Sequence, residues 1–280
     1  MSDPIVSVKC VRHVYPDRTE VSLCGMELDI EAGEIVAVLA ANGAGKTTLL
    51  QHITGMLKPV EGGVQVFGLD PYIDFEKIRP RLGVVFQNPA EQIIGPTVRD
   101  DIAFGLGHLK LSQRKLDTRV QAILKQLGIQ HLADKVPHYL SGGEVKKVAM
   151  AGALVPRPEL LILDEPFSEL DTWAVAELVQ LLREVNEELG CSMVFTSHQL
   201  EPVAMLADKV YVLHQGHVLT QGTPREVFQQ QDILEQARLK APELFQLVHL
   251  LRQAGLEIEA DWDVAKVARR ILAAQGFKRK

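Results

Sequence analysis

The stretch Leu39-Ala40-Ala41-Asn42-Gly43-Ala44-Gly45-Lys46-Thr47-Thr48 decides the fold expected for this chain. It follows an apolar run, Ile35 to Leu39, that predicts a buried strand, and it leads into a helix predicted over Thr47 to Thr54. Gly43 and Gly45 allow backbone N–H groups to point into one concavity, and the start of the helix adds unpaired donors and a partial positive charge. A strand, tight turn and helix of this kind predict a phosphate-binding loop.

Within this loop, Lys46 is expected to reach the terminal phosphates and Thr47 to offer its hydroxyl to the Mg²⁺ that accompanies them. The alternative interpretation is an ordinary Gly-rich turn before a helix. The usual phosphate-loop pattern has Gly where this chain has Ala40. If the backbone there required a positive φ, Ala would cost about 1 kcal/mol. The expected phosphate-binding residues are Asn42, Gly43, Ala44, Gly45, Lys46, Thr47 and Thr48.

Length and composition indicate a globular protein with a large core. The chain has 280 residues, of which 46% are hydrophobic and 24% charged, and this length corresponds to about two domains. No apolar run approaches the roughly 20 residues of a membrane-spanning helix, and Met1 to Cys10 lacks the pattern of a secretory signal. The formal net charge of −6 argues against a nucleic-acid-binding protein. An acidic surface could instead receive basic segments of a protein partner.

Apolar runs separated by turns predict a sheet interrupted by a helical segment, and hence an α/β fold. A helical pattern runs from Thr97 to about Ala133, and a further helix is expected at Val145 to Val155, after Leu140 to Glu144. We interpret this region as a helical insertion into the α/β domain. Helices are also expected at Thr172 to Leu189, Pro242 to Ala254 and Asp261 to Ala274. The expected strands are Ile5 to Val11, Val21 to Ile30, Val64 to Phe67, Gly83 to Phe86, Leu160 to Leu163, Cys191 to Phe195, Lys209 to His214 and His217 to Gln221.

Polar residues directly follow three of these strands. Asp164 and Glu165 end the run from Leu160, Gln87 follows another strand, and His198 follows a third. In an open α/β sheet, ligands bind at the carboxyl ends of the strands. Asp164 therefore suits Mg²⁺ positioning and Glu165 a general base that polarises water. Gln87 could contact the metal or water and His198 a phosphate, although a loop glutamine and a structural histidine are equally simple interpretations.

Three further features have both a functional and a structural interpretation. Leu140-Ser141-Gly142-Gly143-Glu144 precedes a helix and predicts either a second anion site or only a helix cap. Tyr15 could stack on a flat base or simply pack in a turn, and Asp171 could be only the N-cap of the next helix. The acidic cluster Glu91, Asp100 and Asp101 suits either a basic partner or a solvated helix start.

In this order the motifs resemble those of the ATP-binding cassette (ABC) ATPases. The segment from Ala40 to Thr47 matches the Walker A motif, Gln87 the Q-loop, Leu140 to Glu144 the signature, and Leu160 to Glu165 Walker B. Ser168 to Asp171 matches the D-loop and His198 the switch histidine. The resemblance covers about residues 3 to 228. It departs from the family at Ala40 and Ala41, where Gly and Pro are usual, and at Glu144, where Gln is commoner.

The resemblance implies a P-loop NTPase fold with a mixed sheet core, an antiparallel β subdomain, a helical insertion and a C-terminal helical appendage. It implies that residues 1–228 form the ATP-binding domain, with the insertion at about 97–155, and that residues 229–280 form the appendage, a candidate for dimerisation. Two cassettes would bind ATP between the Walker A of one and the signature of the other. The resemblance implies that Tyr15 stacks on adenine, that Lys46 binds the phosphates, and that Thr47 and Gln87 bind Mg²⁺ with Asp164 nearby. It implies that Glu165 activates water and that His198 contacts the γ-phosphate. The residues implied to contact the nucleotide from across the interface are Ser141, Gly142, Gly143, Glu144 and Asp171.

A finer pattern is similar to the ATPase subunits of energy-coupling-factor importers, which take up cobalt, nickel and vitamins. It comprises Val85 to Pro89, Gln92, Gly95 to Val98 and Asp100 to Gly105. This similarity implies a peripheral subunit on the cytoplasmic face of the cell membrane, bound to an integral coupling subunit and a substrate-binding membrane subunit. The alternative is a soluble ABC ATPase that is not coupled to transport. The sequence leaves open the transported substrate and whether the two cassettes are identical.

Overall fold

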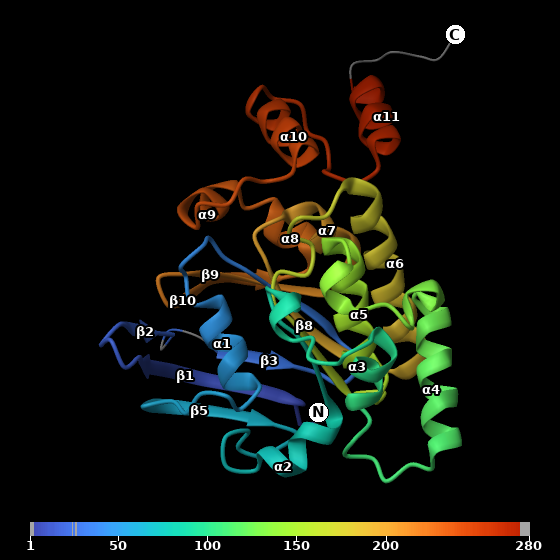
Figure 1. The fold of residues 1–280 in the computed structure, drawn as a ribbon. Coiled ribbons are helices and arrows are strands. Elements are labelled where there is room, and N and C mark those ends of the chain that lie inside the picture. The colour runs from blue at the N-terminus through green and yellow to red at the C-terminus, as the bar shows by residue number, and fades with distance from the viewer. Residues whose placement is uncertain (1–2, 24, 26, 275–280) are drawn as a thin grey trace.

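Two β-sheets form the framework of the chain, and helices cover them on several sides (Figure 1). The structure is a computed structural model and describes residues 3–23, 25 and 27–274. The larger sheet has six strands in the order β10-β9-β4-β8-β7-β6. Its strands are β4 (Ile35–Leu39), β6 (Leu82–Val85), β7 (Leu160–Leu163), β8 (Ser192–Ser197), β9 (Lys209–His214) and β10 (His217–Gly222). All neighbours are parallel except β10, which pairs antiparallel with β9.

Strand β4 lies in the middle of this sheet and is buried on both faces. Ile35, Ala37 and Leu39 pack into one hydrophobic cluster, whereas Val36 and Val38 pack into the other. An apolar run without polar alternation is what a parallel strand covered on both sides requires. The register aligns Leu39 with Ser197 of β8, and Leu163 of β7 with Phe195, so these strands end at one edge of the sheet.

The smaller sheet is antiparallel and corrects one prediction. Strand β1 (Val6–Val14) pairs with β2 (Glu20–Ser22), β3 (Glu27–Ile30) and β5 (Glu61–Val66). The single strand predicted over Val21 to Ile30 is wrong, because β2 and β3 are separate strands that pair with different parts of β1. The strand predicted from Val64 begins earlier, since Glu61 to Gly63 also pair with β1.

Helix α1 (Lys46–Ile53) packs between the two sheets. Its Leu49, Leu50 and Ile53 belong to the cluster that contains residues of β1 and of β4. The predicted helix is confirmed within one residue at each end. This packing fixes the phosphate loop between β4 and α1 from both sides.

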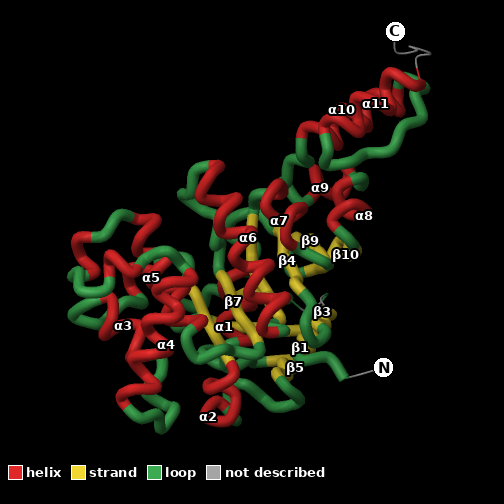
Figure 2. Tube along the Cα trace, turned by 90° about the vertical axis from the view of Figure 1, so that its right-hand side faces the viewer, coloured by secondary structure: helices red, strands yellow, loops and turns green. Residues whose placement is uncertain are grey.

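The helices predicted between residues 97 and 155 are confirmed as α3 (Val98–Phe104), α4 (Gln113–Gln126) and α5 (Gly142–Leu154). They pack on one another and lie together beside the larger sheet (Figure 2). Helix α6 (Thr172–Leu189) agrees with its predicted bounds. The shorter segments α2 (Phe75–Ile78), η1 (Arg79–Arg81), η2 (Pro89–Glu91), η3 (Gln130–Leu132), η4 (Pro137–Tyr139) and α7 (Leu200–Leu206) complete this part.

The last two helices of the described chain extend away from both sheets, whereas the helix that follows β10 packs against β9 and β10 (Figures 1 and 2). Helix α8 (Pro224–Phe228) begins with a capping box of Thr223 and Glu226. It is followed by α9 (Gln231–Gln236), α10 (Glu243–Gln253) and α11 (Val264–Ala274). The basic tail Lys278 to Lys280 lies outside the described residues. Among the helices in the described ranges, none combines the length and hydropathy needed to cross a bilayer.

His52 lies in the last turn of α1, is buried in the core and is held in its neutral form. Its side chain is 1% exposed, and its Nδ1 lies 3.0 Å from the Leu57 carbonyl oxygen. Burial, and then the nearby charge of His13, lower the pKa of His52 to about 4. An unfolded chain would protonate the same imidazole near its ordinary pKa of 6.5. Since the unfolded state binds the proton first, His52 makes folding less favourable as the pH falls from 6.5 toward 4.

We therefore expect His52→Gln to reduce the acid sensitivity of folding. Between pH 7.5 and pH 5, wild type should lose about 2 kcal/mol more of its unfolding free energy than the variant. Urea unfolding of both proteins at the two pH values measures this difference, and the carboxylates common to both cancel. An equal loss in the two proteins would contradict the assignment.

Candidate functional site

The phosphate loop has the backbone conformation that its glycines predict. Gly43 and Gly45 have φ angles of 78° and 90°. A Cβ on Gly45 would also lie 2.9 Å from Val21 Cγ1, so this position excludes a side chain for two reasons. Ala40 is absent from the described residues that have a positive φ. The strain considered for Ala40 therefore does not arise.

Helix α1 begins without a side-chain cap. Its N-cap is Gly45, which has no side chain to accept a hydrogen bond, and the first intrahelical bond is donated by the Leu49 N–H to the Gly45 carbonyl. In contrast, Thr97, Ser141, Asp171 and Thr223 cap their own helices with side-chain oxygens. The first N–H groups of α1 are therefore available to an anion, together with the positive end of the helix dipole.

The side chain of Lys46 extends from this helix toward the edge of the larger sheet. Its Nζ donates to the carbonyl oxygens of Ala40 and Ala41 at 2.8 and 3.3 Å. The same Nζ lies 3.0 Å from Glu165 Oε1, an ion pair without hydrogen-bond geometry. Both side chains are less than a tenth exposed. Opposite charges must compensate each other in such a place, because an unpaired buried charge is costly.

Asp164 joins three elements at the same edge. Its Oδ2 accepts a hydrogen bond from Thr47 Oγ1 at 2.7 Å, and its Oδ1 accepts one from Thr196 Oγ1 at 2.6 Å. The Thr196 hydroxyl also accepts the N–H of Glu165 at 3.0 Å. Thr196 is fully buried in β8, next to the end of β7. These bonds align the phosphate loop with the strand that carries the two carboxylates.

His198 contacts the second of these carboxylates. Its Nδ1 lies 2.9 Å from Glu165 Oε2, while its side chain remains 44% exposed. Glu165 thus lies between Lys46 on one oxygen and His198 on the other. The structure brings together the predicted residues Lys46, Thr47, Asp164, Glu165 and His198, which come from three separate segments.

Gln87 and the signature residues lie elsewhere. Gln87 is exposed, and within the described residues no hydrogen bond links it to Thr47 or Asp164. It lines a cavity of about 480 Å³ together with Gly142, Lys146 and Ser168. The start of α5 and the loop after β6 therefore face one cavity, and among the described residues no hydrogen bond or ion pair joins Ser141 or Glu144 to the phosphate loop.

The start of α5 is closed by its own side chains. Glu144 Oε2 accepts hydrogen bonds from the Ser141 N–H at 2.7 Å and from Ser141 Oγ at 2.8 Å. These hydrogen bonds from Ser141 lower the pKa of Glu144. Ser141, Gly142 and Gly143 are exposed. The predicted role of these residues as a second anion site stays a prediction. In this structure the Ser141 hydroxyl donates its hydrogen bond to the Glu144 carboxylate.

Tyr15 and Asp171 have local contacts. Tyr15 Oη and Thr48 Oγ1 lie 2.9 Å apart, and the Tyr15 ring packs edge-on against His13. Tyr15 is therefore next to the phosphate-loop helix. The Asp171 carboxylate accepts the Ala174 N–H at 2.9 Å and caps α6, as the structural interpretation predicted.

The sequence analysis did not assign a role to Thr196 or to Lys146. The only signal for Thr196 in the sequence is that it is a polar residue in an apolar strand, directly before Ser197 and His198. Lys146 was visible only as a lysine after the signature, yet it is buried. A polar residue inside a strongly apolar segment was the available signal in both cases.

We expect Thr196→Val, which keeps the shape of the side chain, to destabilise the protein. Asp164 Oδ1 would lose a donor and the Glu165 N–H would lose its acceptor. Leaving buried polar groups unpaired costs about 1–3 kcal/mol. Urea unfolding measures this cost, and Thr118→Val, which removes an exposed hydroxyl of α4, provides the control. Equal stabilities of Thr196→Val and wild type would contradict the role of Thr196.

Comparison with known proteins agrees with this geometry. Residues 23–168 match the family described as ABC transporter. The energy-coupling factor transporter ATP-binding protein EcfA of Methanoculleus marisnigri is 41% identical over 257 residues, covering 91% of this chain and 92% of that protein.

Two solved structures have the same fold. CbiO1 from Clostridium perfringens, part of the ABC transporter complex CbiONQ, has a TM-score of 0.74 at 38% identity, covering 89% of this chain and 100% of that chain. The ATP-binding cassette MJ0796, in a dimeric post-hydrolysis state with ADP and Pi, has a TM-score of 0.70 at 27% identity, covering 79% of this chain and 99% of that one. The chain belongs to the ABC transporter ATP-binding proteins of the energy-coupling factor type, and it is an ATPase.

Proposed function

We propose that this ATPase powers an importer for a metal ion or a vitamin, with ATP cleaved at the sheet edge that carries Glu165. The observation that carries the assignment is the Glu165 carboxylate, held between Lys46 and His198 beside an uncapped helix. A buried carboxylate near a phosphate site suits a general base that accepts a proton from the attacking water.

The phosphates of ATP would bind the N–H groups of residues 42–48 and the ammonium of Lys46. In the free chain the Lys46 ammonium faces Glu165 Oε1. A triphosphate is a stronger anionic partner, so its binding would draw Lys46 away and leave Oε1 to accept a proton. His198 would keep its contact with Oε2 and hold the carboxylate toward the γ-phosphate. Tyr15, next to Thr48, would stack on adenine.

The oxygen atoms near the loop fit Mg²⁺. The Thr47 hydroxyl and the Asp164 carboxylate lie 2.7 Å apart, and Mg²⁺ prefers such oxygen ligands. Thr47 and Asp164 would hold the ion, and Gln87 would approach it from the loop after β6. The ion would supply charge neutralisation at the phosphates.

A second cassette would complete the site. The exposure of Ser141, Gly142 and Gly143, and the dimeric state of the MJ0796 cassette, support this arrangement. Ser141, Gly142, Gly143 and Asp171 would then face the nucleotide of the partner, and Glu144 would release the Ser141 hydroxyl. Residues 1–228 would form the cassette, with its insertion at 97–155, and residues 229–280 would contribute to dimerisation. Exposed apolar residues of α10 and α11 support the last point: Leu250, Val264 and Leu272.

Two membrane proteins, a coupling subunit and a substrate-binding subunit, would hold the ATPase at the cytoplasmic face of the cell membrane. The chain is similar to EcfA and to a part of the CbiONQ complex, which supports this assignment. The exposed side chains of Ile94 and Phe104 lie near the acidic residues Glu91 and Asp100 and suit a partner with basic and apolar residues. The Asp101 carboxylate already has partners within the chain, because its Oδ1 accepts hydrogen bonds from the N–H groups of Ile94 and Gly95.

We expect Glu165→Gln to lower kcat for ATP hydrolysis by about 10²-fold or more, because the amide cannot act as a base. The KM for ATP should not rise, because Glu165 contacts no part of the phosphate loop other than Lys46 among the residues described, and its amide would compete less with the phosphates for that ammonium. Phosphate release at several ATP concentrations measures both constants. Glu177→Gln, which alters an exposed carboxylate of α6, is the matched control. A wild-type kcat in Glu165→Gln would remove Glu165 from the mechanism.

A second prediction tests the membrane partner. We expect the double substitution Glu91→Gln and Asp100→Asn to weaken co-purification with membrane subunits and leave basal ATP hydrolysis unchanged. Glu187→Gln with Glu188→Gln makes the same charge change on the exposed end of α6 and should leave co-purification intact. The transport assignment fails, in favour of a soluble ATPase, if wild type itself retains no membrane protein under mild detergent extraction.

A further inference from the structure

Lys146 is a buried lysine outside the set of residues that bind nucleotide. It lies in α5, the helix that begins after Ser141, and it is 9% exposed. In the described part of the chain, no carboxylate lies within ion-pair distance of its ammonium. Burial lowers the pKa of Lys146, and the charges of Glu169 and Glu165 oppose this effect. A buried ammonium without a paired carboxylate needs another source of compensation.

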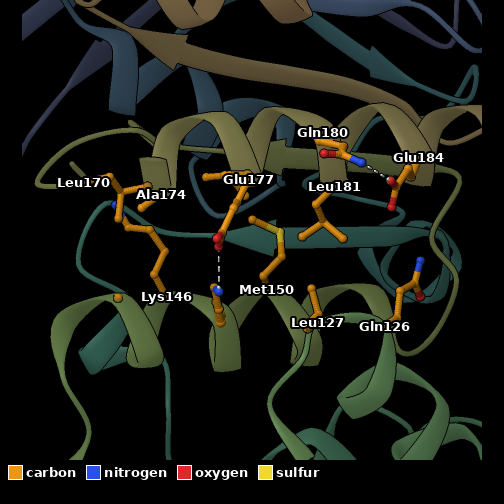
Figure 3. Close-up of a pocket in the computed structure, with 13 residues that line it drawn as sticks. Gln126, Leu127, Lys146, Met150, Leu170, Ala174, Glu177, Gln180, Leu181 and Glu184 are labelled. Atoms are coloured by element: carbon orange, nitrogen blue, oxygen red, sulfur yellow. Dashed lines mark hydrogen bonds and ion pairs between the residues drawn. The ribbon is translucent and has the colours of Figure 1, made fainter. Parts of the chain in front are cut away.

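Two backbone carbonyls provide this compensation. Lys146 Nζ donates to the Pro166 carbonyl oxygen at 2.9 Å and to the Ser168 carbonyl oxygen at 2.6 Å. Both carbonyls belong to the loop that directly follows Glu165. In Figure 3 the Lys146 side chain extends from α5 toward Leu170, at the end of the same loop. Hydrogen bonds from a charged donor are stronger than those between neutral groups.

The loop that Lys146 contacts is strained at both ends. Glu165 has a φ of 49° and Glu169 a φ of 61°, in the left-handed region. For residues other than glycine this conformation is strained. Such a conformation persists only where surrounding contacts hold it.

Contacts on the opposite side of the loop hold its middle. Phe167 is 1% exposed, and its ring packs edge-on against Phe195 with centroids 5.7 Å apart. Ser168 donates from its N–H and its Oγ to the Glu165 carbonyl oxygen. Lys146 is thus the contact from α5 that closes the loop against the helix.

We propose that Lys146 is a positioning residue, which holds the loop from Glu165 to Glu169 against the signature helix so that the Glu165 carboxylate stays aligned for catalysis. The inference rests on the role proposed above for Glu165. It extends that role, because the side chain that fixes Glu165 comes from the helix whose first residues would meet the nucleotide of a partner cassette.

The neighbouring Lys147 provides a matched control. It lies on the same helix, but its ammonium pairs with Glu177 of α6 at 3.1 Å. Its side chain is 44% exposed, and it has no hydrogen bond to the loop among the described residues. Changing Lys147 therefore removes an equal charge without removing a contact to the loop.

The test compares Lys146→Met, Lys146→Arg and Lys147→Met with wild type and Glu165→Gln in steady-state ATP hydrolysis. Methionine fills the space but donates no hydrogen bond, so we expect kcat to fall by about 10- to 100-fold while the KM for ATP changes by about twofold or less. Arginine keeps the charge and the donors and should recover part of kcat. Lys147→Met should behave as wild type. If Lys146→Met does not fold, Lys146→Leu replaces it under the same criteria.

The outcomes separate this inference from the proposed function. A wild-type kcat in Lys146→Met, with a loss in Glu165→Gln, would overturn the positioning role and leave the role of Glu165 intact. A wild-type kcat in Glu165→Gln would overturn both. An equal kcat in Lys146→Arg and Lys146→Met, in folded proteins, would also overturn the positioning role, because the donated hydrogen bonds would then not explain the loss.

Discussion

The buried carboxylate of Glu165 is the group on which the rest of the site depends. Its two oxygens face Lys46 and His198, and its backbone N–H is bound by Thr196. A carboxylate that is 5% exposed requires this compensation, and its partners come from two segments, the start of α1 and the end of β8. The charge balance therefore links the phosphate-loop helix, the end of β8 and the loop before α6. A site built in this way responds to an added anion, because a phosphate competes for the same ammonium.

The N-termini of two helices, α1 and α5, differ in whether side chains cap them. Helix α1 begins at Gly45 and has no side-chain cap, whereas α5 begins with Ser141 and Glu144, which satisfy each other. The first start is open in the free chain and the second is closed by a carboxylate of its own. The Glu144 carboxylate thus places a negative charge at the start of α5, next to the positive end of the helix dipole.

Much of the fold could be predicted from the sequence, because its strongest signals are local. Leu160 to Leu163 and Thr172 to Leu189 have the predicted bounds, since an unbroken apolar run and a capped amphipathic pattern each depend on neighbouring residues. The region from Val21 to Ile30 was predicted wrongly as one strand, because its division into β2 and β3 depends on pairing with two parts of β1. The early start of β5 at Glu61 has the same cause, as glycines there pair with β1 despite a turn-like composition.

The sequence by itself determined the family, the phosphate loop and the strand ends that carry Asp164, Glu165 and His198. Each of these motifs is a short run of neighbouring residues, so it can be identified without the tertiary structure. The tertiary structure alone decided which of them touch. The pairing of Lys46 with Glu165, the bridge from Thr47 through Asp164 to Thr196, and the reach of Lys146 to the loop carbonyls each join residues from separate segments. The physical reason is that buried polar groups must find partners in space, and the order of strands in the sheet, rather than distance along the chain, decides which partners are near.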